Sequence, residues 1–83
     1  MKVYLDDGGE KRLIGRADVP EGAGPVFEVP MFGAAAPSIV ESFAIGTVTH
    51  QPEGGGAPVV ERAVLAAPGQ LVELLPGWVP LAS

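Results

Sequence analysis

The sequence predicts one small all-β domain over residues 1–83, with about six short strands in a mainly meander order, closed into a barrel or a sandwich. The chain contains 12 glycines and 9 prolines, and these gather in clusters between short apolar runs. Gly tolerates positive φ and Pro fixes φ near roughly −65°, so both residues suit chain reversals. The runs between the clusters are rich in Val, Ile, Leu, Phe and Thr, which favour strands.

The first half of the chain predicts strands at residues 2–5, 11–17 and 26–32. The Asp7-Gly8 pair suits a tight hairpin between the first two strands. Gly15 indicates a bulge or a close backbone approach within the second strand. Pro30 has no amide donor, so the third strand should lie at a sheet edge or carry a bulge.

The second half predicts strands at residues 41–50, 59–66 and 71–75. An alternative remains before the fourth strand, because Ser38 and Glu41 have the spacing of a helix capping box and a helix could then span residues 38–45. The β-branched run Thr47-Val48-Thr49 favours the strand, with at most one helical turn near residues 38–41.

Two Pro-Gly pairs, Pro68-Gly69 and Pro76-Gly77, suit type II turns on either side of the sixth strand. The second turn should bring Trp78 back against the end of the barrel or sandwich.

Strand parity predicts which side chains form the core. We expect these to be mostly buried: Val3, Leu5, Leu13, Phe27, Val29, Met31, Phe43, Ile45, Val64, Val72 and Leu74.

Charge and composition restrict the class of function. The formal net charge is −5, and an acidic surface disfavours nucleic acid and anionic membranes. The chain contains no cysteine, which excludes thiolate chemistry and favours a reducing, cytoplasmic setting. The apolar runs are too short to span a membrane as helices.

Candidate catalytic and metal-binding groups have weaker support than structural roles. Glu28, Glu41, Glu61 and Glu73 each follow an apolar pair on a different expected strand. A row of these carboxylates would need cations, so four independent strand glutamates are the favoured interpretation. The acids around Gly8-Gly9 do not have calcium-loop spacing, and His50 has no second His or Cys as a zinc co-ligand. We therefore expect no catalytic residue, cofactor or metal.

The function predicted best is a non-enzymatic protein-interaction or accessory module that binds a protein partner or itself, for instance as a homodimer. The expected interaction face lies opposite the core side of the third and sixth strands, and Trp78 could contribute to it or close the core instead. Its residues are Val26, Glu28, Phe32, Leu71, Glu73, Leu75 and Trp78. The alternatives are a small structural component of a phage or other assembly, and a small enzyme with a glutamate-based site.

Overall fold

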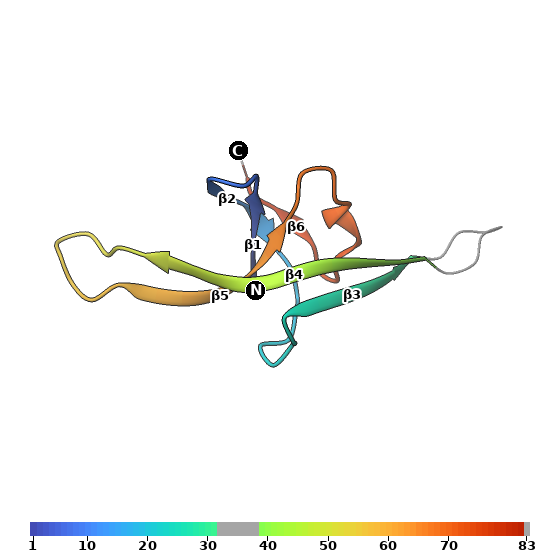
Figure 1. The fold of residues 1–83 in the computed structure, drawn as a ribbon, viewed down its shortest axis with the longest axis horizontal. Coiled ribbons are helices and arrows are strands. Elements are labelled where there is room, and N and C mark those ends of the chain that lie inside the picture. The colour runs from blue at the N-terminus through green and yellow to red at the C-terminus, as the bar shows by residue number, and fades with distance from the viewer. Residues whose placement is uncertain (32–38, 83) are drawn as a thin grey trace.

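The computed structural model describes residues 1–31 and 39–82, without the side chains of Met31 and Ile39. Six strands form one mixed sheet in the order β3-β4-β5-β1-β2-β6 (Figure 1). The elements are β1 (Lys2–Asp6), β2 (Lys11–Arg16), β3 (Val26–Met31), β4 (Ile39–His50), β5 (Val59–Ala66), the 3-10 helix η1 (Val72–Leu74) and β6 (Val79–Pro80). The prediction of a small all-β domain is confirmed.

The strand alternative at residues 39–45 is also confirmed, since β4 begins at Ile39 and continues to His50. Residues 39–41, expected as a helical turn at most, belong to this strand, and Ser38 lies outside the described residues. The β-branched run Thr47-Val48-Thr49 and its upstream apolar neighbours therefore determine the conformation, rather than the capping-box spacing.

The strand order departs from a meander at two points. β1 lies between β5 and β2, and it pairs with β5 in parallel through Val3↔Val64 and Leu5↔Ala66. The second departure is β6, which pairs with β2 in antiparallel orientation. The other three pairs, β1-β2, β3-β4 and β4-β5, join consecutive strands in antiparallel orientation. The expected closure into a barrel does not occur within the described sheet, because β3 and β6 are its two edges.

Both Pro-Gly turns form as the sequence predicts. Gly69 and Gly77 have φ of 88° and 65°, the positive values that the third position of a type II turn requires. Their closing hydrogen bonds run from the amide of Gln70 to the carbonyl of Ala67 and from the amide of Trp78 to the carbonyl of Leu75.

The segment between these turns is not a strand, which corrects the prediction of a sixth strand at residues 71–75. Val72–Leu74 form η1. The amide of Leu71, the residue before η1, donates to Oε1 of Glu41 at 3.0 Å. The turns at residues 67–70 and 75–78 are so close together that the segment between them is too short to pair with a neighbouring strand. The short strand β6 comes after the second turn instead.

The main core cluster lies on one side of the sheet, beneath the segments that follow β2 and β5, and Tyr4 and Ala63 are also buried on the other side. The buried residues of the main cluster are Val3, Ala17, Val19, Val29, Phe43, Ile45, Val64, Ala66 and Leu75. Five of the predicted core residues are buried, namely Val3, Val29, Phe43, Ile45 and Val64. Five others are only half-buried, namely Leu5, Leu13, Phe27, Val72 and Leu74. The remaining prediction, the side chain of Met31, lies outside what the structure describes.

Gly15 is both a close approach and the neighbour of a bulge, as expected. The register between β1 and β2 shifts after Val3↔Gly15, so that Tyr4 pairs with Leu13 and Ile14 is the extra residue. A Cβ on Gly15 would lie 2.5 Å from Cη2 of Trp78. Trp78 is half-buried and packs against the core, in agreement with its closing role.

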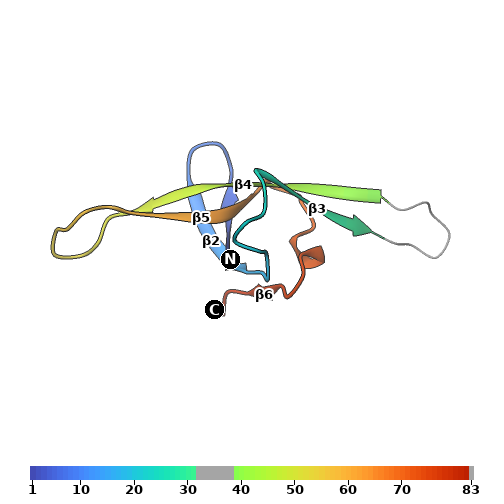
Figure 2. The same cartoon turned by 90° about the horizontal axis from the view of Figure 1, so that it is seen from below.

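The molecule is elongated, with principal extents of 55 × 29 × 23 Å. Figures 1 and 2 show why: the two ends of the long β4 extend from the body in opposite directions. At one end β4 pairs with β3, and at the other with the first half of β5. We call these two-stranded parts the β3–β4 arm (residues 26–31 and 39–44) and the β4–β5 arm (residues 46–50 and 59–63).

Candidate functional site

The β3–β4 arm has one side that faces away from the core. Antiparallel partners share a side of the sheet, and the pair Phe27↔Phe43 lies on the core side. The pairs Val26↔Ala44 and Pro30↔Val40 therefore lie on the opposite side. Val26 is 54% exposed and Val40 is 52% exposed, so this side presents apolar groups to solvent.

The β4–β5 arm exposes valines on both of its sides. Val59 pairs with His50 and Val60 pairs with Thr49, so the two valines point in opposite directions from the ribbon. Val59 is 55% exposed and Val60 is 64% exposed. Isolated two-stranded ribbons are marginally stable in water, and a third strand or a covering layer normally supports them.

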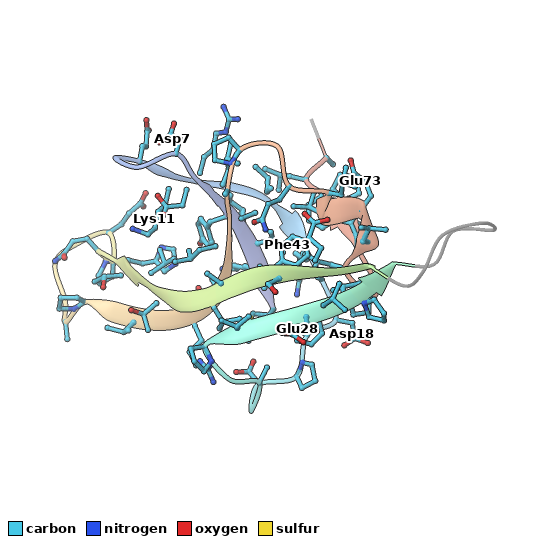
Figure 3. All side chains as sticks on the ribbon, turned by 45° about the vertical axis from the view of Figure 1, so that its right-hand side comes forward. Asp7, Lys11, Asp18, Glu28, Phe43 and Glu73 are labelled. Carbon is cyan, nitrogen blue, oxygen red and sulfur yellow. The ribbon has the colours of Figure 1, made fainter. Side chains whose placement is uncertain are left out.

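The residues predicted for one interaction face do not lie together. Val26 and Glu28 are exposed on the side of β3 that faces away from the core. Leu71 lies on the other side of the sheet, because its amide binds Glu41, the ladder partner of the buried Val29. Figure 3 shows the labelled side chains of Glu28 and Glu73 on different sides of β4.

Leu75 does not fit an exposed face, because it is only 2% exposed and belongs to the core. The expected exposure of Leu75 is therefore wrong, and the reason is the same 3-10 turn that replaces the sixth strand. Leu71 and Glu73 are exposed, Trp78 is half-buried, and Phe32 lies outside the described residues.

A polar cluster joins the β4–β5 arm to β1, and the sequence did not reveal it. Nε2 of His50 lies 3.2 Å from the hydroxyl of Tyr4 and 3.0 Å from Oε2 of Glu61. Nζ of Lys2 lies 3.4 Å from the same carboxylate oxygen. Tyr4 and His50 are separated by 46 positions along the chain, so no local pattern connects them. Only the parallel pairing of β1 with β5 brings Tyr4 close to His50, and the sequence did not predict that pairing.

Nε2 of His50 faces two oxygen groups at once. The carboxylate of Glu61 only accepts hydrogen bonds, whereas the hydroxyl of Tyr4 can donate or accept, so the role of this ring nitrogen toward each depends on the tautomer of His50. The cluster is part-buried and is not among the side chains that line the two cavities described below. Its geometry accounts for attachment of the arm to β1.

The four glutamates do not form a row. Glu61 belongs to the polar cluster, and Glu41 accepts the amide hydrogen bond from Leu71. Glu28 and Glu73 are exposed on different elements. The partial inward position of Glu41 follows from its parity with Phe43, and the amide of Leu71 satisfies its carboxylate there.

The acids of the β1–β2 loop bind their own backbone. Oδ1 of Asp6 accepts from the amide of Gly8 at 3.1 Å, and Oδ1 of Asp7 accepts from the amide of Glu10 at 3.2 Å. These bonds are characteristic of Asx turns. Within residues 1–31 and 39–82, no three His, Asp or Glu side chains are placed to hold a metal ion.

Two open cavities lie away from the arms. One of about 390 Å³ is lined by Met1, Arg16, Ala17, Asp18, Gly77 and Val79. The other, of about 140 Å³, is lined by Leu5, Asp7, Glu10 and Arg12 at the β1–β2 hairpin. At the first cavity the N-terminal ammonium group of Met1 donates to the carbonyl of Ala17, and at the second the amide of Glu10 donates to Oδ1 of Asp7.

No family model matches this chain, and neither a curated protein nor a solved structure matches it. Among the residues that the structure describes, no helix has the length and apolar character needed to cross a membrane.

Proposed function

We propose that this protein is a non-enzymatic interaction module, which acts by protein–protein contact through the apolar side chains of its two arms. The observation that supports this most is the exposure of Val59 and Val60 on opposite sides of one two-stranded ribbon. A two-stranded ribbon that exposes a valine on each side gains stability when another chain covers it. The exposed Val26 and Val40 give the β3–β4 arm a similar character.

A structural role in an assembly is the second candidate, and the shape of the molecule favours it. The arms extend from the body in opposite directions and give the molecule a longest extent of 55 Å (Figures 1 and 2). A subunit with contact surfaces at both ends can join two neighbours at once. Such a subunit would form rings or filaments rather than a single closed pair.

Affinity capture from the source cells, with variants of the β3–β4 arm, tests the proposal. The wild type is compared with the double variant Val26→Lys/Val40→Lys, which introduces charge at two exposed positions without opening the core. The matched control is Val79→Lys, because Val79 is 60% exposed but lies on β6, away from both arms.

We expect the wild type and Val79→Lys to capture the same proteins, and the double variant to lose them. All three proteins must keep the wild-type melting temperature for the comparison to hold. Identical capture by all three would contradict a contact through this arm, and loss by Val79→Lys alone would place the contact on β6.

A further inference from the structure

The β4–β5 arm has an unpaired backbone edge along β5. β1 pairs with β5 only from Val64 to Ala66, and within the described sheet no strand lies beside Val59–Ala63 on that side. The backbone amides and carbonyls that point outward there resemble those of a free sheet edge. This edge is adjacent to the most exposed of the large apolar side chains described, Val60 at 64%.

The charged residues of this edge do not shield it. Glu61 is held by Lys2 and His50 of its own chain. Arg62 donates to the carbonyls of Glu21 and Ala23, at 2.6 and 2.7 Å. Both charges are therefore directed toward their own molecule, whereas natural edges are commonly protected by outward charges, prolines or bulges.

We propose that a second copy of this chain pairs along this edge, with β5 antiparallel to β5 across a two-fold axis. This inference rests on the interaction role proposed above and specifies its partner. The pairing converts two ribbons of two strands into one ribbon of four, in the order β4-β5-β5-β4. That number of strands meets the requirement for a stable sheet, which the isolated arm does not.

Sterics, charge and strand length favour one register. A centre at Val59 would place Pro58 opposite Val60, so that within β5 only Val59 itself would be paired. Antiparallel partners share a side of the sheet, so a two-fold pair of identical strands must centre on a residue that faces its own copy. A centre at Val60 places Pro58 opposite Arg62 of the partner, and the pairing ends where β1 begins beside β5. A centre at Glu61 or Arg62 would bring like charges together and drive the partner strand into β1.

In this register the edge of β5 is complementary to the same edge of a second copy. Val60 meets Val60 of the partner on one side of the ribbon, and Val59 lies beside Glu61 of the partner on the other. The same strand supplies both halves of the contact, and the two-fold axis closes it after two copies. The overlap is only about five residues per chain, so we expect a weak dimer below the usual interface size.

Single-cysteine variants test the register directly, because the chain contains no cysteine. The variants are Val60→Cys and, as the matched control, Thr49→Cys, whose position is the exposed partner of Val60 on β4. Directly opposed residues have Cα separations of roughly 4.5–5.5 Å, within the range that a disulfide spans. Val59→Cys provides a second comparison, since its opposed residue would be Glu61 of the partner rather than itself.

Under mild oxidation we expect Val60→Cys to form a covalent dimer several-fold faster than Thr49→Cys and Val59→Cys. Equal rates at all three positions, or no dimer from Val60→Cys, would overturn the proposed pairing. These results would leave the interaction role itself untouched, because the capture experiment depends on the other arm. The opposite result is also informative. If the Val26→Lys/Val40→Lys variant captured the same proteins as the wild type while Val60→Cys cross-linked rapidly, the contact through the β3–β4 arm would be contradicted and the β5–β5 pairing would be supported.

Discussion

Trp78 packs directly on the backbone of Gly15, so closely that a Cβ at residue 15 would lie 2.5 Å from Cη2 and 2.8 Å from Cζ3 of its ring. The carbonyl oxygen of Val79 would be equally close to that Cβ. This contact attaches the C-terminal segment to β2 and depends on the absence of a side chain at residue 15.

The first prediction follows from this contact. Gly15→Ala should destabilise the fold by about 1–3 kcal/mol, because the indole ring and the backbone of β6 must both move. Gly22→Ala is the control, since a Cβ there would have no neighbour within 4 Å. Thermal unfolding of both variants measures the difference, and equal melting temperatures would show that Trp78 does not hold this position in solution.

The second prediction concerns the centre of the core. Phe43 is completely buried, whereas Phe27, its ladder partner, is only half-buried. Phe43→Ala should cost about 3–5 kcal/mol, a large part of the stability of a small domain. Phe27→Ala should cost clearly less. Urea unfolding compares the two, and a greater loss from Phe27→Ala would reverse the assigned depth of these rings.

The third prediction concerns Glu41, which anchors η1 to β4. Replacement by Ala removes the acceptor of the exposed Leu71 amide and should cost about 0.5–1.5 kcal/mol. Glu41→Gln retains an oxygen acceptor and should cost less. Hydrogen exchange at the Leu71 amide gives the direct readout: faster exchange in Glu41→Ala than in Glu41→Gln is expected, and unchanged exchange in both would rule out the anchor.

The fourth prediction concerns the polar cluster. Tyr4→Phe keeps the ring but removes the hydroxyl that contacts His50, so a loss of about 0.5–1.5 kcal/mol is expected. Amide exchange should accelerate in the β4–β5 arm more than in the β3–β4 arm. If both arms exchange as in the wild type, the cluster does not attach the arm to β1.

Local chemistry made most of the elements predictable from the sequence. Positive φ at Gly69 and Gly77 follows directly from the Pro-Gly pairs, and the predicted strand at residues 41–50 follows from its β-branched residues, although β4 begins two residues earlier, at Ile39. The segment Val72–Leu74 was predicted wrongly, because a short apolar run between two turns resembles a strand whether or not a partner strand is within reach. Its burial of Leu75 then removed one residue from the expected interaction face.

Long-range pairing was the part that local patterns could not supply. The parallel contact of β1 with β5 joins residues about 60 positions apart, and no turn chemistry encodes it. The same pairing brings Tyr4 to His50 and leaves the edge at Val59–Ala63 free. Exposure of Val26 and Glu28 was predicted correctly, since it depends only on strand parity.

Sedimentation velocity over a concentration series tests most directly whether the exposed valines serve protein contact, with a second copy as partner. For the wild type, we predict a sedimentation coefficient that increases with concentration, from that of an 8.5 kDa monomer toward that of a dimer. Val60→Lys should remain monomeric at every concentration with an unchanged melting temperature. A wild-type coefficient that stays at the monomer value up to the highest concentration would contradict the account.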